Sequence, residues 1–288
     1  MRLRSQLPAN ISEEEGRVNI AHGDIQDPVF VEGAARRYGA TAAFVCLTGD
    51  NELMLTLNLF DALQRSGSVK HVVYLSGCGD YGFDVIRSGN ALKRNASGHV
   101  VVKYILEAKL RHGIPPRSEE GGFSWTILGP TLFFSNDLRS KKPLLERGFF
   151  DEPLGDKGVS RVDTKDIALA AANALEDDGN VWSGKKVMIG SLERYTNKDT
   201  EMLWSNALGV EVTSVLSDKE GLDATEENLK QFLSPMWARD LTLMYKYFSQ
   251  EGFGMTGAEY DEQVALLGKT PSSYEEFVRT TAEEWKSS

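Results

Sequence analysis

Three side chains that could do chemistry occur between residues 76 and 103. Ser76 ends an apolar run, KHVVYLS, that reads as a buried strand, whereas His99 and Lys103 lie in a segment of helical character. Their i, i+4 spacing places the imidazole and the amine on one face of a helix. A histidine exchanges protons near neutral pH, and a neighbouring lysine can orient a ligand through its charge. Ser76, His99 and Lys103 are therefore our candidate catalytic residues.

Each candidate also has a purely structural explanation, and the sequence leaves both open. Ser76 either holds a substrate or simply ends its strand, and Lys103 is otherwise a surface lysine on an amphipathic helix. His99 either works as an acid and base or caps the helix that starts after Gly98. Cys78, which lies close to Ser76, is expected to be an inert buried thiol.

The loop after Ser76 has the sequence pattern of a dinucleotide-binding loop, with Gly77, Gly79 and Gly82 spaced as G-x-G-x-x-G. Such a loop holds a pyrophosphate only when a strand precedes it, a helix opens within it and an acidic residue ends the next strand about 20 positions on. The strand is present, but the segment 83–98 lacks a helical apolar face, and no acid closes a strand at the right distance. We therefore expect no helix and no pyrophosphate site after this loop.

Strand-like and helix-like segments alternate along most of the chain. The segments 17–25, 41–49, 70–76, 123–130 and 185–190 read as strands, and the segments 28–39, 52–67, 98–113, 165–177 and 197–209 read as helices, the last of them capped by Asn197. Apolar strands separated by helices indicate a parallel sheet covered on both faces, which is a doubly wound α/β domain. Ligands of such sheets bind at the carboxyl ends of the strands.

After Gly209 the pattern becomes helical and rich in aromatic residues. We expect a Rossmann-like core over residues 1–209, with cap elements inserted around 139–162, and a smaller helical cap over residues 210–288 on the carboxyl edge of the sheet. Aromatic side chains recur at helical spacing in this cap, which is more typical of a core than of a ligand site. They are Trp237, Tyr245, Tyr247 and Phe248.

The composition argues against several classes of protein. The chain has 288 residues and a formal net charge of −10, which is unfavourable for nucleic-acid binding. Two cysteines, Cys46 and Cys78, cannot form a disulfide framework, and no Cys/His cluster has the spacing of a metal site. No apolar run approaches the roughly 20 residues that span a bilayer, and no secretory signal opens the chain. We therefore expect a cytoplasmic protein without a metal, a membrane or a nucleic acid as partner.

The combined layout resembles a known group of enzymes. A serine at the carboxyl end of a strand, facing a helix that carries H-x-x-x-K, is similar to the catalytic layout of short-chain dehydrogenases. From about Val18 to Val212, the segments VNIAHGDIQDP, AAFVCLTG, VKHVVYLS, GHVVVKYILEAKLRHG, SWTILGPTLFFSNDL, VDTKDIALAAANAL and KKVMIGSLERYTNKDTEMLWSNALGVEV resemble, in this order, the NmrA-like family of atypical short-chain dehydrogenases.

The resemblance implies a Rossmann-type domain with a smaller capping region and NADP(H) or NAD(H) as cofactor. The activity it implies is reduction of a carbonyl or a conjugated double bond in a small metabolite. Two alternatives stay open. One is a non-enzymatic regulator that senses the cofactor or binds another protein, in the cytoplasm or the nucleus. The other is a cofactor-independent isomerase or cyclase that uses the same pocket.

The resemblance also assigns roles to residues of this chain. It places Lys103 in the position of the active-site lysine that grips the nicotinamide ribose, and His99 where many short-chain dehydrogenases have tyrosine. Tyr81 is an alternative acid, because SGCGDYG resembles the S-S-x-x-x-Y-G of extended short-chain dehydrogenases. Gly129 stands where the family often has arginine. Besides Lys103, the residues matched to cofactor contacts are Arg4, Asp24, Ile25, Leu47, Thr48, Gly49, Pro130, Phe133, Phe134 and Asn136.

One unit of the family pattern is absent from the sequence. Family members open with a strand, a G-x-x-G-x-x-G loop and a helix, whereas MRLRSQLP of this chain resembles the second strand, with Arg2 and Arg4 on the adenosine side. The missing strand would be central in the sheet, and the missing helix would hold the pyrophosphate at its N-terminus. Either the sequence is part of a longer protein, or the sheet has re-paired. We therefore expect weak or absent cofactor binding in this chain.

Overall fold

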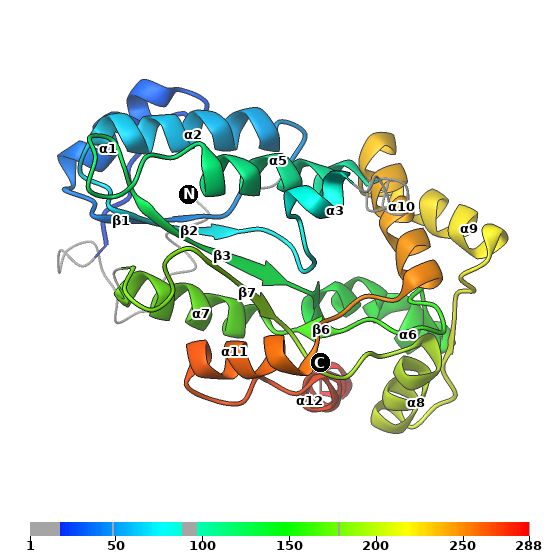
Figure 1. Ribbon diagram of the computed structural model, residues 1–288. Coiled ribbons are helices and arrows are strands. Elements are labelled where there is room, and N and C mark those ends of the chain that lie inside the picture. The colour runs from blue at the N-terminus through cyan, green and yellow to red at the C-terminus, as the bar shows by residue number, and fades with distance from the viewer. Residues whose placement is uncertain (1–17, 48, 88–96, 178, 288) are drawn as a thin grey trace.

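The computed structural model describes residues 18–47, 49–87, 97–177 and 179–287 of the chain (Figure 1). Its centre is a sheet of four parallel strands, in the order β1 (Ala42–Val45), β2 (His71–Leu75), β3 (Ser124–Pro130) and β7 (Lys185–Ile189). In register, His71 of β2 lies beside Ala42 of β1 and beside Ser124 of β3. Because all neighbours are parallel, the carboxyl ends of the strands meet at one edge of the sheet. The predicted parallel α/β sheet is confirmed.

Helices cover both faces of this sheet (Figure 1). Helices α1 (Pro28–Arg37), α2 (Glu52–Ser66) and α5 (Gly98–His112) lie on one face, and α7 (Thr164–Glu176) and α11 (Gly257–Leu267) lie on the other. Successive side chains of a strand point to opposite faces, so β2 supplies both cores. Val72 and Tyr74 pack with the first group, whereas Val73 packs with the second. Burial on both faces explains why the strand sequences are apolar throughout.

Helix α11 also closes the end of β7 through one side chain. The backbone amide of Gly190, just after β7, donates to Gln263 Oε1 (2.8 Å), and Gln263 Nε2 donates to the carbonyl of Gly190 (2.6 Å). Gln263 is fully buried. Its amide therefore satisfies both backbone groups of one residue at this end of the sheet.

A second group of elements stands beside the carboxyl edge of the sheet (Figure 1). Its helices are α6 (Lys141–Arg147), α8 (Asn197–Leu208), α9 (Lys219–Leu229), α10 (Pro235–Glu251) and α12 (Tyr274–Lys286), with the 3-10 helix η3 (Phe134–Ser140). Its short parallel strand pairs are β4 (Leu132–Phe133) with β6 (Arg161–Val162), and β5 (Phe149–Phe150) with β8 (Thr213–Ser214). These elements enclose a core that contains Phe150, Trp204, Tyr245 and Tyr274. Across the ranges that the structure describes, no helix has the length and apolar character to cross a bilayer.

Two local predictions differ from the structure. Residues 18–25 have no strand structure and lead into a turn that caps α1 through Asp27. A strand needs a neighbour for its backbone hydrogen bonds, and within the described residues β1 pairs with β2 alone. The cap of α8 is Thr196 and not Asn197, because Thr196 forms a reciprocal capping box with Asp199.

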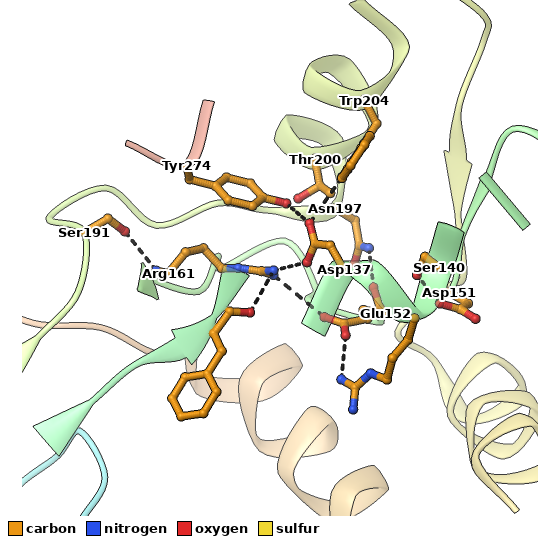
Figure 2. A network of polar contacts seen from close by, with 12 residues as sticks. Asp137, Ser140, Asp151, Glu152, Arg161, Ser191, Asn197, Thr200, Trp204 and Tyr274 are labelled. Atoms are coloured by element: carbon orange, nitrogen blue, oxygen red, sulfur yellow. Dashed lines mark hydrogen bonds and ion pairs between the residues drawn. The ribbon is translucent and has the colours of Figure 1, made fainter. Parts of the chain in front are cut away.

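A buried polar network connects the elements of the second group (Figure 2). Arg161 of β6 and Asp137 of η3 are both fully buried and form an ion pair. The other carboxylate oxygen of Asp137 accepts hydrogen bonds from the hydroxyl of Tyr274 and from the indole of Trp204 (3.2 Å). The guanidinium of Arg161 also lies 4.7 Å from the centre of the Tyr274 ring. One carboxylate therefore connects η3, β6, α8 and α12.

The same arginine reaches the carboxyl edge of the sheet. Arg161 Nη2 donates to the carbonyl of Phe133 (3.4 Å), and the Arg161 backbone amide donates to Ser191 Oγ (2.9 Å). Glu152 lies 3.8 Å from Arg161 Nη1 and accepts a hydrogen bond from Arg139 (2.7 Å). The network thus holds the backbone at Phe133 in place.

Candidate functional site

A cleft of about 1210 Å³ lies over the carboxyl ends of β1, β2 and β3. Its floor includes residues that follow these strands, namely Leu47, Ser76 and Thr131. Helix α5 borders one side and helix α10 the other. This is where open parallel sheets bind ligands. Within the part of the chain that the structure describes, His, Cys, Asp and Glu side chains form no group of three or more that could hold a metal.

Aromatic side chains line the α10 side of the cleft. Trp237, Tyr247 and Phe248 of α10 contribute to it, together with Phe253 just after the helix. The prediction of core positions holds for Tyr245 and Phe248, but Trp237 and Tyr247 are only partly buried and border the cleft. Helical spacing could not separate the two groups, because α10 packs on the core along one face and lines the cleft along another. The cleft therefore suits an apolar, planar molecule.

Lys103 of α5 lines this cleft and is neutralised there by a buried acid. Its amine forms an ion pair with Glu52, the first residue of α2, and both residues are buried (9% and 3% exposed). The amine also lies 5.6 Å from the centre of the Tyr74 ring. Burial and the nearby Glu52 raise the pKa of Tyr74, so its phenol stays protonated. An ammonium group has three N–H donors, so Lys103 can bind a further acceptor in the cleft without losing its partner.

His99 lies one turn before Lys103 and is oriented by a carboxylate of α10. Its Nδ1 contacts Asp240 Oδ2, which favours the Nδ1–H tautomer and leaves Nε2 as the proton acceptor. Asp240 also accepts hydrogen bonds from the backbone amides of Gly98 and of His99 (3.4 Å). Burial alone would raise the pKa of Asp240, but these hydrogen bonds hold it below its ordinary value. Asp240, from a distant helix, therefore caps α5 and positions the imidazole.

Ser76 lines the cleft but donates its hydroxyl hydrogen to a buried acid. Ser76 Oγ lies 2.5 Å from Glu107 Oε1, and Glu107 is fully buried on α5. The same carboxylate oxygen accepts a hydrogen bond from Lys186 of β7 (2.7 Å), and Oε2 accepts one from Arg111 (3.1 Å). Burial lowers the pKa of Lys186, against the effect of Glu107. A hydroxyl has one hydrogen, so toward a ligand Ser76 offers lone pairs and not a proton.

The glycines of the loop after Ser76 make room for Tyr81. A Cβ at Gly77 would lie 3.0 Å from the Tyr81 hydroxyl oxygen, and a Cβ at Gly79 would lie 3.1 Å from its ring. Gly79 also has a φ of +126°, which residues with side chains rarely adopt. The Tyr81 hydroxyl donates to the carbonyl of Cys78 (3.0 Å), and burial raises the pKa of this phenol well above its ordinary value. Tyr81 is therefore a packing residue and not an acid that works near neutral pH.

The surroundings of this loop differ from the family pattern in two ways. A helix does follow it, contrary to the prediction, but α3 (Phe83–Arg87) has only five residues, little more than one turn. At Gly129, a Cβ would lie 2.7 Å from Met188 Sδ and 3.0 Å from the carbonyl oxygen of Gly77. The arginine that the family often has there would not fit without a shift of its neighbours.

A second G-x-G-x-x-G occurs at Gly252, Gly254 and Gly257. It follows helix α10 instead of a strand, and it leads into α11. The first turn of α11 is closed by a capping box between Thr256 and Glu259, whose carboxylate occupies the place of an anion. This motif therefore does not provide a pyrophosphate site.

The structure brings some of the residues matched to cofactor contacts into the cleft. Those that line it, beside the candidates Ser76 and His99, are Leu47, Lys103, Pro130, Phe133 and Asn136. Asp24, Ile25 and Gly49 lie in or beside turns outside this lining, and Phe134 is buried in the second core, 5.3 Å from Tyr274 between ring centres. Arg4 and Thr48 lie outside the described residues.

Four residues at or beside the site were not predicted from the sequence: Glu52, Glu107, Arg194 and Asp240. One of them had a usable signal, because Glu107 lies four residues before Arg111, at the ion-pair spacing of a helix, and the two side chains do pair. Glu52 and Asp240 are far in sequence from Lys103 and His99, so no local pattern could pair them. Only the tertiary fold brings these acids to α5.

A nicotinamide dinucleotide fits these residues in part. Lys103, Leu47, Pro130 and Phe133 line the cleft, and the family resemblance matches them to cofactor contacts. For the pyrophosphate, the two G-x-G-x-x-G motifs in the described residues are engaged in packing and in a helix cap. The described residues therefore provide for one end of the cofactor and not for its diphosphate.

Comparison with known proteins gives a partial match in sequence. No family model matches the chain. An NAD(P)H azoreductase of Xenophilus azovorans is 27% identical to it over 163 residues, which is 57% of this chain. The chain spans half (50%) of the length of that curated relative.

Solved structures of similar fold cover nearly the whole chain. A nucleoside-diphosphate-sugar epimerase from Staphylococcus aureus superimposes with a TM-score of 0.74 at 15% identity, over 97% of this chain and 88% of its own. The quinone oxidoreductase QOR2 of Escherichia coli, solved with NADPH, gives 0.73 at 18% identity over 92% and 83%. NmrA, a negative transcriptional regulator solved with NAD, gives 0.65 at 16% identity over 96% and 85%. The chain therefore has the Rossmann-like fold of NAD(P)-binding proteins such as NmrA, as the family resemblance implied.

Proposed function

We propose that this chain is a reductase-type protein that uses NAD(P)H to reduce a carbonyl or a conjugated double bond of a small molecule with a flat apolar framework, and that it binds the dinucleotide weakly. The observation that carries this proposal is the position of Lys103, which lines a cleft at the carboxyl ends of parallel strands with its charge balanced by Glu52. The names of the similar azoreductase and quinone oxidoreductase, both NAD(P)H-dependent, support it.

The residues of the cleft would divide the work between cofactor and substrate. Lys103 would orient the nicotinamide end, while Glu52 holds its amine in place. His99, oriented by Asp240, would exchange a proton with the substrate through Nε2. The aromatic side chains of α10 would exclude water from the bound molecule. The cofactor, when bound, supplies the hydride.

We expect weak dinucleotide binding because the described residues provide no site for the diphosphate. Without backbone amides at the N-terminus of a long helix, the diphosphate loses its main source of affinity. Calorimetric titration with NADPH should therefore give a dissociation constant weaker than about 100 μM. A micromolar constant for this 288-residue chain would show that the weak-binding part of the proposal is wrong.

Measuring NADPH-dependent reduction tests the reductase part of the proposal. At millimolar NADPH, the chain should reduce a short quinone or an azo compound, and Lys103→Met/Glu52→Gln should do so at least about tenfold more slowly. The double variant removes both charges and so avoids an unpaired buried carboxylate. Lys109→Met is the matched control, because Lys109 lies on the same helix and donates to the surface carbonyl of Gly113 (2.9 Å). No NADPH-dependent turnover in the unchanged chain would reject the reductase, and an unchanged rate in the double variant would reject the role of Lys103.

A second candidate is a cofactor-independent isomerase, and the His99–Asp240 pair favours it. A histidine with a carboxylate on Nδ1 can act as a base without any cofactor. Isomerisation of a β,γ-unsaturated ketone without nicotinamide, lost in His99→Gln, would support it. An unchanged rate in that variant would remove it.

A further inference from the structure

We propose that Arg194 binds the anionic group of an aromatic ligand in the cleft. Among the described residues, the cationic side chains that line the cleft are Lys103, Arg139 and Arg194. Lys103 pairs with Glu52, and Arg139 pairs with Glu152 (2.7 Å). Arg194 is exposed and forms no hydrogen bond or ion pair with any residue that the structure describes. Its counter-ion can therefore come from a ligand in the cleft.

Backbone hydrogen bonds between three segments hold Arg194 in position. The neighbouring Tyr195 exchanges two of them with Val159 (3.0 and 2.9 Å), and the amide of Ser160 donates to the carbonyl of Phe253 (2.7 Å). These bridges join the chain before β6, the chain after β7 and the chain after α10. The backbone is therefore held at the residue next to Arg194, which reduces the entropy lost when a ligand binds.

Two glycines let the arginine lie against this junction. A Cβ at Gly158 would lie 2.9 Å from Arg194 Cβ, and a Cβ at Gly254 would lie 2.7 Å from Arg194 Nε. A Cβ at Gly254 would also collide with Ser160 Oγ. This hydroxyl is fully buried and has no hydrogen-bond partner among the described residues, although buried polar atoms normally have one. The Arg194 guanidinium and the buried Ser160 hydroxyl therefore both lie next to Gly254, and of these three residues Arg194 and Gly254 line the cleft.

The charge of Arg194 acts on the cleft itself. Burial raises the pKa of the Cys78 thiol in the cleft lining to about 12, and the charge of Arg194 opposes this increase. Glu259, an acid that acts on the same thiol, is already bound by the amide and the hydroxyl of Thr256 (2.7 and 2.9 Å). Glu251 also lines the cleft and has an interaction of its own. Arg194 is thus the cation available to a ligand at this end.

The side chains around Arg194 define the rest of the ligand. Phe248 and Phe253 line the cleft with ring centres 4.8 Å apart, and Tyr247 lies next to them. Such walls bind flat apolar molecules. The ligand class is therefore an aromatic compound that carries a sulfonate or a carboxylate. The inference rests on the proposed function only in that this compound would be the substrate that is reduced.

A matched pair of fluorescent probes tests the charge alone. Anilinonaphthalene sulfonate and N-phenyl-1-naphthylamine have the same aromatic framework, and only the first carries an anionic group. Each probe is titrated without nicotinamide into the unchanged chain, Arg194→Gln, Arg194→Lys and the control Lys219→Gln. Lys219 is an exposed lysine of α9. In Arg194→Gln the sulfonate should bind at least about tenfold more weakly, because a charged hydrogen bond is lost, while the neutral probe changes less than about twofold.

Other outcomes have clear meanings. Arg194→Lys should recover part of the sulfonate affinity, and Lys219→Gln should leave both affinities unchanged. Equal sulfonate binding by the unchanged chain and Arg194→Gln would overturn the inference, as would equal losses for both probes. The binding assay needs no turnover, so it can fail while the reductase proposal holds, and it can succeed while NADPH-dependent turnover is absent.

Discussion

Near the cleft, buried acidic side chains form ion pairs with buried lysines. Lys103 and Glu52 form one such pair, and Lys186 and Glu107 form another. Removing one partner of a buried pair leaves an uncompensated charge, which costs about 3–5 kcal/mol, whereas replacing both partners costs much less. Single substitutions at these positions therefore mix effects on activity with effects on folding.

At this scale, the sequence could identify chemical side chains but not their partners. His99 and Lys103 share a helix face and line the cleft, and that spacing was visible in the sequence. The partner of Lys103 lies 51 residues away in sequence, and that of His99 lies 141 residues away. The glycine pattern that starts at Gly77 was ambiguous, because these glycines make room for the Tyr81 ring. The sequence pattern alone does not show which ring packs there.

The glycines of the loop after Ser76 give a direct test of their packing role. Gly79→Ala should lower the free energy of unfolding by about 1–3 kcal/mol, because alanine is strained at this positive φ and its methyl group meets Tyr81. Gly82→Ala is the matched control, since its Cβ would meet only the carboxylate tip of Asp80 (3.1 Å). Urea unfolding followed by circular dichroism measures both variants. Equal losses would contradict the packing explanation.

Among the elements, α5 depends on α10 for its first turn. Asp240 of α10 accepts hydrogen bonds from two backbone amides at the start of α5 and contacts the imidazole of His99. A carboxylate at this place satisfies amides that have no partner within the helix and also opposes the helix dipole. The α10 side of the cleft is therefore attached to the α5 side by one residue.

Asp240→Asn should lower the free energy of unfolding by about 1 kcal/mol at pH 7. The hydrogen bonds hold the pKa of folded Asp240 below its ordinary value of 3.8. Its contribution should therefore be complete above pH 5 and disappear as the pH falls through the lowered pKa, below 4. Urea titrations from pH 7 to pH 3 compare the variant with the unchanged chain and with the exposed control Asp156→Asn. A difference that already disappears between pH 6 and pH 5 would contradict this assignment.

Periodicity predicted most of the elements because burial on both sheet faces makes their patterns strong. The predicted strand at residues 18–25 is wrong for a physical reason, since a strand depends on a neighbour that can lie anywhere in the chain. The prediction of Asn197 as the cap of α8 was wrong for a different reason. Asn197 is a good cap residue, but its side chain accepts from the amide of Gly155 (2.7 Å), and Thr196 takes the cap position instead.

At the scale of the whole molecule, the C-terminal helices join both groups of elements. Helix α11 packs on β7 and α7 of the sheet, whereas α12 packs on α8 of the second group. The division of the chain near residue 209 stays a prediction, as does a regulatory protein partner. The long-range network at Asp137 had no sequence signal, because its members come from η3, β6, α8 and α12.

Tyr274→Phe should lower the free energy of unfolding by about 1–3 kcal/mol, because Asp137 loses one of its buried donors while the ring over Arg161 is kept. Tyr38→Phe, at an exposed tyrosine (45% exposed), is the matched control and should have no measurable effect. Tryptophan fluorescence and circular dichroism should report one coincident transition in both variants, since the network and the sheet are packed together. A loss in Tyr274→Phe no larger than in the control would show that this hydrogen bond does not stabilise the fold.

The contact between Gln263 and Gly190 also bears on how the protein would fail when heated. A sheet that ends in open backbone groups can recruit strands from other molecules and grow into aggregates. Here the Gln263 amide occupies both backbone groups of Gly190, so a foreign strand can pair at this position only after α11 detaches. Loosening of one surface helix, well before global melting, would then set the onset of precipitation.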